Sequence, residues 1–481
     1  MLIFDVGTTG ARTIIFDKEG NICKKAYQEY PVPKQPVGIS EQDPEIWWNA
    51  IKKTCNIVMK KEKPQEIVGI CGSFARETTS IVNKEGKVLH PAFTWMDERE
   101  EMDAKAWEEE GGLRRAIPKL LWLKKNKEDL FKKAFKISFP ITYIYQKLCG
   151  CYITDPTNGV YGIMNHSTLD WDEELAELYD LPIDLWPEIK TPGEIVGELQ
   201  SPAAKELGLQ SNIPIIVGGG DQQCAALGLG VIDEGQVKIT NGTGTFVDLV
   251  VDEPIKAAGD IPIFSIPAMV NDKWHIEGVM PGTGTTLKWF KDNFSQLQMK
   301  ESQEKDVDVY DMLAKEAEQI EPGSNGLLIL PLYIFRKGTI HGLGWNHSRA
   351  HMIRAIMESS ALSGQMYLQM LLAMGKATIS EIKADGGAMN SDLWAQILAD
   401  VIGKRITVPE VRDGASLGSA ILGALATKYY NSIEEAVEKM VRFEKQYEPI
   451  KKHQRVYKKL SRIFMPALLD IYQNKRVTKD L

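Results

Sequence analysis

Short apolar runs that alternate with glycine-rich turns open the chain. Residues 2–6 and 11–16 form two such runs around Gly7-Thr8-Thr9-Gly10, which predicts a β-hairpin with a tip of glycine and threonine. Residues 44–60 and 119–126 are predicted to be helical. A dinucleotide fold or a Walker P-loop needs a helix directly after the glycine turn, so the hairpin argues against both.

The same pattern returns in the second half of the chain. Residues 213–217 are apolar and end at three glycines, after which Asp221 begins a helical run. Two further apolar runs, 237–240 and 246–251, flank Asn241-Gly242-Thr243-Gly244-Thr245, a second Gly-Thr hairpin. This repetition predicts a duplicated α/β fold with two lobes, residues 1–225 and 226–481, that face each other across a cleft.

Composition narrows the class of partner. Of 481 residues, 43% are apolar and 25% charged, as expected for a folded chain of more than one domain. The 57 Lys and Arg against 65 Asp and Glu give a net charge of −8, which argues against a nucleic-acid partner and favours small substrates. No apolar run approaches the roughly 20 residues of a membrane span, and Met1 leads straight into a strand, so we expect a cytoplasmic protein without a membrane partner.

The two hairpins are candidate phosphate sites. Glycine lets a phosphate approach the backbone closely, and threonine adds a hydroxyl beside the exposed amides. Asp5, just before the first hairpin, could hold Mg²⁺ through water. Ordinary hairpin turns are the alternative, but their repetition with threonine in both favours phosphate binding by Gly7, Thr8, Thr9, Gly242, Thr243 and Gly244.

Asp221 is the strongest single candidate for catalysis. A carboxylate between three glycines and a helix lies at the end of a strand, where it could accept a proton, although a helix cap would also explain it. The pair Arg76-Glu77 offers donors and acceptors to a polyhydroxylated ligand, whose carbon face Trp95 and Phe246 could cover. A surface salt bridge is the alternative for this pair.

Taken together, these residues resemble the FGGY carbohydrate kinases over nearly the whole chain. That family shares the duplicated, ribonuclease H-like ATPase fold of actin, hexokinase and Hsp70-type proteins. The motifs that carry the resemblance are 5–10, 119–126, Gly220-Asp221-Gln222-Gln223, 241–245, 338–358 and Asp385-Gly386-Gly387-Ala388.

The resemblance implies transfer of a phosphoryl group from ATP, with Mg²⁺, to a primary hydroxyl of a polyol or sugar. Asp221 would be the general base and Asp5 would hold the metal. Substrate contacts are implied for Arg76, Glu77, Trp95, Asp221, Gln222 and Phe246. ATP contacts are implied for Gly7, Thr8, Thr9, Arg12, Gly242, Thr243, Gly244, Gly284, Gly386, Gly387 and Ala388. A homodimer is plausible on the same ground.

The substrate is less sharply indicated. Arg76-Glu77, Trp95 and Phe246 look like the glycerol-contacting positions of glycerol kinases. Residues 113–118 replace a tyrosine of those enzymes, however, and the loop 332–337 lacks a Gly-Glu-Arg-x-Pro motif. These departures look closer to xylulokinases and autoinducer-2 kinases. We therefore expect a polyol or ketose kinase, with glycerol and a pentulose such as xylulose as candidates and autoinducer-2 as the alternative.

Two alternatives belong to other classes of protein. One is a non-catalytic sugar sensor, or an Hsp70-like ATPase, on the same fold; Asp221 beside Arg76-Glu77 argues against it. The other is a nicotinamide-dependent enzyme, suggested by Gly282-Thr283-Gly284. Leu287 stands where the third glycine of the dinucleotide fingerprint is required, so this alternative is weak.

Overall fold

The computed structural model describes residues 1–31, 36, 38–60, 66–99, 114–255, 263–269, 272–331 and 338–473. The loop 332–337 and the first residue of the stretch 113–118 lie outside the described residues. The chain forms two compact units. The first contains residues 1–232, 252–275 and 413–442, and the second contains residues 233–251, 276–412 and 443–481.

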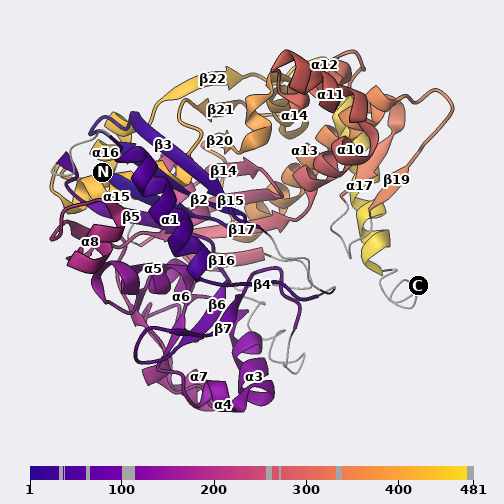
Figure 1. Cartoon of the computed structure of the whole chain (residues 1–481). Coiled ribbons are helices and arrows are strands. Elements are labelled where there is room, and N and C mark those ends of the chain that lie inside the picture. The colour runs from indigo at the N-terminus through magenta and orange to yellow at the C-terminus, as the bar shows by residue number, and fades with distance from the viewer. Residues whose placement is uncertain are drawn as a thin grey trace. The chain divides into compact units, whose positions relative to one another are not determined.

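A mixed sheet forms the centre of the first unit (Figure 1). Its strand order is β11 (Ile195–Glu198), β12 (Pro214–Ile216), β5 (Ile70–Phe74), β1 (Leu2–Val6), β2 (Gly10–Phe16) and β3 (Ile22–Glu29). Strands β1 and β2 are the predicted antiparallel hairpin, and β5 pairs with β1 in parallel. Every residue of β1 and β5 is buried, and both strands are mostly apolar, with Asp5 and Ser73 as their polar residues.

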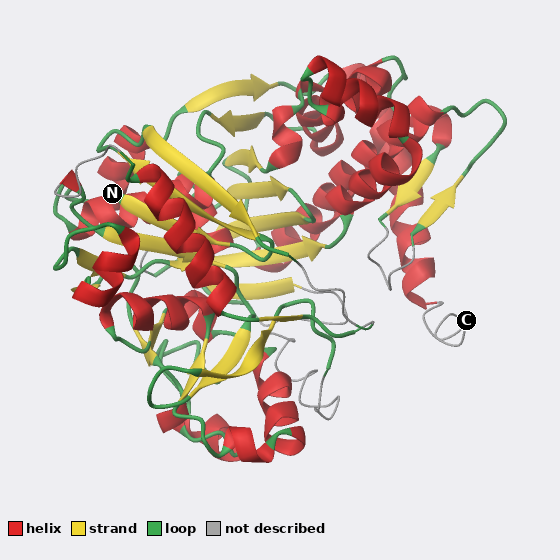
Figure 2. Cartoon of the chain, viewed as in Figure 1, coloured by secondary structure: helices red, strands yellow, loops and turns green. Residues whose placement is uncertain are grey.

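Helices and a smaller sheet complete the first unit (Figure 2). Helix α1 (Glu45–Val58) packs on β2 and β3, where the sequence predicted a helix over 44–60. The smaller sheet has the order β4 (Glu41–Gln42), β7 (Val88–Phe93), β6 (Thr79–Val82) and β8 (Lys136–Ser138). Strand β13 (Gly219–Gly220) pairs with β5. The first unit also contains α3 (Ala116–Asn126), α4 (Glu128–Phe131), α5 (Pro140–Cys149), α6 (Pro156–Gly159), α7 (Glu173–Leu178), α8 (Ser201–Leu207), β9 (Ile153–Thr154), β10 (Glu188–Ile189) and α9 (Asp221–Gly228).

The sheet of the second unit repeats the topology of the first. After β16 (Ile263–Pro267), the order of this seven-stranded sheet is β17 (Trp274–Met280), β15 (Thr245–Val251), β14 (Gln236–Asn241), β20 (Glu381–Asp385), β21 (Ile406–Pro409) and β22 (Phe443–Tyr447). Strands β14 and β15 form the second predicted hairpin, β20 pairs with β14 in parallel, and β21 pairs with β20 in parallel. In the first sheet β5 and β12 follow β1 in the same way. The shared arrangement confirms the duplication.

Helices surround the second sheet. Helix α13 (Arg349–Gly375) packs on β15 and on α14 (Asp392–Ile402). The remaining elements are α10 (Thr283–Phe294), α11 (Gln296–Lys305), α12 (Val309–Glu318), β18 (Leu328–Leu330), β19 (Thr339–His341) and α17 (Lys451–Gln473). Among the described residues, no helix is both long enough and apolar enough to cross a membrane.

Helices α15 (Gly414–Ala426) and α16 (Ile433–Met440) come from late in the chain but belong to the first unit. Glycine explains how closely α15 packs on α9. A Cβ atom at Gly418 would lie 1.9 Å from the carbonyl oxygen of Cys224, and one at Gly228 would lie 1.9 Å from that of Gly414. The helix that begins with Asp221 is therefore held by backbone-to-backbone contact with α15.

Replacing Gly418 by alanine tests this contact. We expect Gly418→Ala to lower the free energy of unfolding by about 1–3 kcal/mol, because the new methyl group has no space. The measurement is the midpoint of thermal unfolding. At an unconstrained helix position the same change stabilises by about 0.5–1 kcal/mol. An unchanged or raised midpoint would therefore contradict the packing.

Candidate functional site

The first Gly-Thr hairpin is braced by side chains from three other segments. The turn closes with a hydrogen bond from Gly7 N to Gly10 O at 3.0 Å, and the Tyr30 hydroxyl donates to Gly7 O. Trp95 Nε1 donates to Thr8 Oγ1 at 3.0 Å, and Gln42 Nε2 donates to the backbone oxygen of Thr8 at 2.6 Å. Trp95, predicted to contact substrate, thus lies against a residue predicted to contact phosphate, while Thr9 is exposed.

Asp5 is buried at the base of this hairpin. Its Oδ1 accepts a hydrogen bond from Ser73 Oγ at 2.7 Å, and its Oδ2 accepts one from Arg12 at 3.1 Å. Asp413 lies 3.8 Å from the same Arg12 nitrogen. Burial raises the pKa of Asp5, and Arg12 and Ser73 partly oppose that rise. The structure therefore brings together two predicted site residues, Asp5 and Arg12.

Asp221 lies where a strand gives way to a helix. It is the first residue of α9, directly after the two glycines of β13. The three glycines are needed for close packing: a Cβ atom at Gly218 would lie 1.6 Å from Gly72 O, and one at Gly220 would lie 2.6 Å from Arg76 Cδ. Arg76 Nε lies 3.5 Å from Asp221 Oδ1, with the arginine side chain 7% exposed and the carboxylate 32% exposed. Arg76 also donates to Gln223 Oε1 at 3.1 Å.

Glu77 adopts a strained backbone conformation. Its φ of 58° is in the left-handed region, which costs a residue with a Cβ atom about 1–2 kcal/mol. Arg115 donates to Glu77 Oε2 at 3.2 Å, and Lys119 Nζ donates to Glu77 O at 3.1 Å and to Thr94 O at 2.9 Å. The Glu77 carboxylate therefore pairs with Arg115, on a different segment of the chain. Arg115 falls in the stretch that replaces a tyrosine, and no role had been predicted for it.

The second Gly-Thr hairpin lies in the second unit and packs against α10. Gly242 N donates to Gly244 O at 2.9 Å, and a Cβ atom at Gly284 would lie 1.9 Å from Gly242 O. Gly386, with φ of 90°, touches the backbone of Asn241. Behind the hairpin, Thr245 Oγ1 lies 2.7 Å from Asn241 Oδ1 and 2.9 Å from Thr283 Oγ1. The segment around Gly284, tested above as a dinucleotide fingerprint, instead supports the hairpin.

Beneath this hairpin are buried charges. Lys238 and Asp248, opposite each other on β14 and β15, form an ion pair of 2.9 Å with both side chains 0% exposed. Thr240 Oγ1 donates to Asp385 Oδ1 at 2.5 Å across the parallel pair β14 and β20. Burial raises the pKa of Asp385, and the charge of Lys238 opposes that rise. The predicted loop 385–388 thus begins with a carboxylate tied to the hairpin strand.

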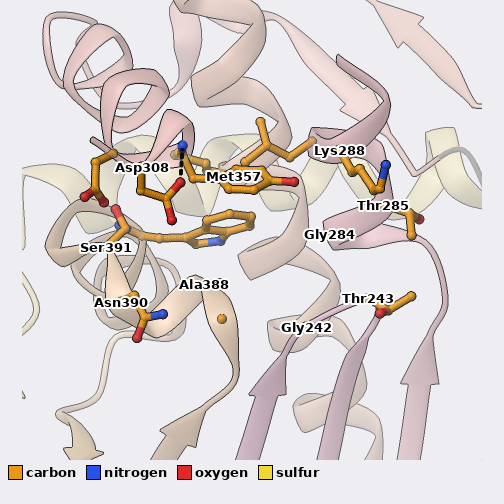
Figure 3. A pocket seen from close by; sticks show the side chains of 15 residues that line it. Gly242, Thr243, Gly284, Thr285, Lys288, Asp308, Met357, Ala388, Asn390 and Ser391 are labelled. Atoms are coloured by element: carbon orange, nitrogen blue, oxygen red, sulfur yellow. Dashed lines mark hydrogen bonds between the residues drawn. The ribbon is translucent and has the colours of Figure 1, made fainter. Parts of the chain in front are cut away.

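A cavity of about 340 Å³ opens beside the second hairpin (Figure 3). Ligand pockets commonly have about this volume or more. Gly242, Thr243 and Gly284 lie on one side of it, and Asp308, Asn390 and Ser391 lie on the other. Five predicted ATP contacts line it: Gly242, Thr243, Gly284, Gly387 and Ala388.

Sequence reasoning missed most of the remaining lining of this cavity. Leu287, Tyr310, Met357 and Trp394 supply apolar and aromatic surface, and Lys288 and Asp311 add charge. These residues come from α10, α12, α13 and α14, and no local motif joins them. Phe246, predicted to contact substrate, lies on β15 in the second unit, whereas Arg76, Glu77, Trp95, Asp221 and Gln222 belong to the first.

Comparison with known proteins agrees with this architecture. Residues 1–228 match the N-terminal domain of the FGGY family of carbohydrate kinases, and residues 237–427 match its C-terminal domain. The gluconokinase of Bacillus subtilis (strain 168) is 28% identical, covering 97% of this chain and 94% of its own. The glycerol kinase of Thermococcus gammatolerans is 30% identical, covering 93% of each, and the xylulose kinase of Staphylococcus xylosus is 26% identical, covering 96% of this chain and 98% of its own.

Solved structures show the same fold. The xylulose kinase from Lactobacillus acidophilus has a TM-score of 0.85 at 23% identity, covering 98% of both chains. The Plasmodium falciparum glycerol kinase with ADP has a TM-score of 0.82 at 23% identity, covering 98% of this chain and 97% of its own. Fold and sequence together define a two-domain α/β phosphotransferase that uses ATP. The chain belongs to the FGGY family of carbohydrate kinases.

Trp394 tests whether this cavity binds the nucleotide. If it does, we expect Trp394→Ala to weaken ADP binding about fivefold, because the lost aromatic surface contributes on the order of 1 kcal/mol to packing on a base. Isothermal titration calorimetry with ADP gives the dissociation constant. Trp289→Ala is the control, since Trp289 is on α10 but is not among the lining residues. Equal affinities for the two variants would remove Trp394 from the nucleotide site.

Proposed function

We propose that the protein transfers the γ-phosphoryl group of ATP to a primary hydroxyl of a small polyol or ketose, with Asp221 as the general base. The observation that carries this proposal is the position of Asp221: a partly exposed carboxylate at the first residue of α9, with Arg76 Nε at 3.5 Å. The helix N-terminus and Arg76 both place positive charge beside the carboxylate. In this scheme residues 1–225 bind the acceptor and residues 226–481 bind most of the nucleotide.

Charge stabilisation carries more of the catalysis than proton transfer. The transition state of phosphoryl transfer is loose, with negative charge spread over the transferred oxygens, so positioned amides and cations contribute most. In our proposal Gly7, Thr8, Thr9 and Arg12 contact phosphate from the first hairpin, and Gly242, Thr243 and Gly244 do so from the second. Gly386, Gly387 and Ala388 contact the adenosine. Asp221 accepts the hydroxyl proton as the new O–P bond forms and the bond between the γ-phosphorus and the bridging oxygen of ADP breaks.

Asp5 fits a water-mediated Mg²⁺ ligand. Each carboxylate oxygen has two lone pairs, and Ser73 and Arg12 engage one oxygen each, so the group can still accept a hydrogen bond from a metal-bound water. Bound Mg²⁺ would neutralise phosphate charge. Arg12 forms ion pairs with both Asp5 and Asp413, and these two carboxylates hold its guanidinium near the hairpin.

Glu77, Arg115 and Trp95 favour a polyhydroxylated acceptor. Glu77 follows Arg76 in the chain and accepts a hydrogen bond from Arg115, so one carboxylate and two arginines can accept from and donate to adjacent hydroxyls. The named relatives act on gluconate, glycerol and xylulose, and others on autoinducer-2, so the acceptor is proposed from these classes. A sugar sensor on this fold is the second candidate; Gln222 and Phe246 would then contact a sugar that is not phosphorylated.

Asp221→Asn tests the general base. We expect kcat to fall at least 1,000-fold, because the amide cannot accept the proton, while ADP binds with unchanged affinity. ADP release measured by a coupled assay gives kcat, and calorimetry gives the affinity. Asp233→Asn, in an exposed turn, is the control. Undiminished turnover in Asp221→Asn would exclude Asp221 as the base.

Glu77→Gln tests the acceptor site. We expect KM for the acceptor to rise about tenfold or more, because a charge-assisted hydrogen bond contributes about 1.5–3 kcal/mol, and KM for ATP to stay constant. The acceptors to compare are glycerol, D-xylulose, D-ribulose, gluconate and the autoinducer-2 precursor. Glu85→Gln, an exposed turn residue, is the control. ATP binding without ADP release on every acceptor would favour the sensor.

A further inference from the structure

The segment Asp155-Pro156-Thr157-Asn158 has no part in the mechanism above, yet the structure buries it completely. Asp155, Thr157 and Asn158 are all 0% exposed. Asp155 precedes helix α6, and its side chain accepts a hydrogen bond from Thr157 N as a helix cap. Three polar side chains buried at one short helix need a complete set of partners.

Asp155 supplies partners for Thr157 and for the amide nitrogen of Asn158, whereas Asn158 Oδ1 has no hydrogen-bond partner among the described residues. Its Oδ2 accepts from Thr157 N at 2.7 Å and from Thr157 Oγ1, and its Oδ1 accepts from Asn158 Nδ2 at 2.7 Å. Burial raises the pKa of Asp155, while the hydrogen bonds from Thr157 and Asn158 lower it. Because the Thr157 hydroxyl donates its hydrogen bond to Asp155, its oxygen can accept a hydrogen bond from a second group through a lone pair.

That second group is the backbone amide of Gly220, the residue before Asp221. Gly220 N donates to Thr157 Oγ1 at 2.7 Å. A Cβ atom at Gly220 would lie 2.9 Å from Thr157 Oγ1 and 2.6 Å from Arg76 Cδ. The threonine hydroxyl and the arginine stem therefore both lie close to the Gly220 backbone, at the start of α9.

We propose that Thr157 is a positioning residue: its hydroxyl, oriented by Asp155, fixes the Gly220 amide and so sets Asp221 against Arg76. This inference rests on the proposed function, in which Asp221 is the base. A displacement of about 1 Å at a reacting group can cost on the order of 100-fold in rate. The lone pair of a single hydroxyl can thus influence turnover without touching the substrate.

Thr157→Val, which keeps the shape and removes the hydroxyl, is the test. We expect kcat to fall 10- to 100-fold, with KM for ATP and the affinity for ADP unchanged. Thr157→Ser restores the hydroxyl and should have kcat within about threefold of the parent. If valine abolishes the thermal unfolding transition, Thr157→Ala replaces it under the same criteria. Turnover of the valine or alanine variant within twofold of the parent would overturn the proposal.

A double-variant comparison separates positioning from a general loss of structure. If Thr157 acts through Asp221, Thr157→Val should not further slow the residual turnover of Asp221→Asn. Equal slowing in both backgrounds would assign Thr157 a structural role and overturn the inference. High turnover of Asp221→Asn alone would instead refute the general base, whatever Thr157 does, so the two failures are distinguishable.

Discussion

One constraint recurs in both sheets: the strand that leads into each Gly-Thr hairpin is tied to its parallel neighbour by a buried hydroxyl-carboxylate hydrogen bond. In the first unit Ser73 of β5 donates to Asp5 of β1. In the second unit Thr240 of β14 donates to Asp385 of β20. In the first unit the carboxylate is on the strand that leads into the hairpin, and in the second unit it is on the parallel neighbour. In both units the hydrogen bond lies just before the turn. This hydrogen bond fixes the strand at the base of each hairpin. The backbone amides at the hairpin tip are therefore oriented before any ligand binds.

The exchange of strands makes the two hairpins electrostatically different. The first carries its carboxylate on the hairpin strand itself, where Arg12 and Asp413 continue the charge network. The second hairpin has a neutral threonine at the equivalent position of its leading strand. The buried ion pair of Lys238 and Asp248 lies further from the turn. Removing one partner of such a pair costs about 3–5 kcal/mol, so the pair holds the base of the second hairpin together. A cation that accompanies phosphate would therefore bind more favourably beside the first hairpin, whose leading strand carries the carboxylate, in agreement with the proposed role of Asp5.

Local features of this molecule could be predicted from the sequence, and distant ones could not. Both hairpins and the helix after Asp221 follow from short patterns of apolar residues, glycine and threonine. The contact of α15 with α9 depends on two pairs of residues nearly 200 positions apart, and Tyr310 and Trp394 share a cavity without sharing a motif. The cap that Asp155 forms at the start of α6, and the link of Thr157 to Gly220, were not predicted, because Thr157 and Gly220 are 63 positions apart in the chain. The left-handed turn at Glu77 also has no sequence signal, because a glycine is the residue expected there.

These differences explain why the class of reaction is easier to assign than the acceptor. In the proposed mechanism, backbone amides and glycines hold the phosphates, and sheet topology sets the positions of these groups, so two similar hairpins suffice to indicate the chemistry. The proposed contacts to the acceptor are instead made by side chains on loops. Glu77 has a left-handed backbone conformation and accepts a hydrogen bond from Arg115, which lies in the stretch 113–118 that is expected to differ from glycerol kinases. A loop can exchange such residues without disturbing β1, β5 or α9, so acceptor choice can diverge while the phosphoryl-transfer frame stays constant.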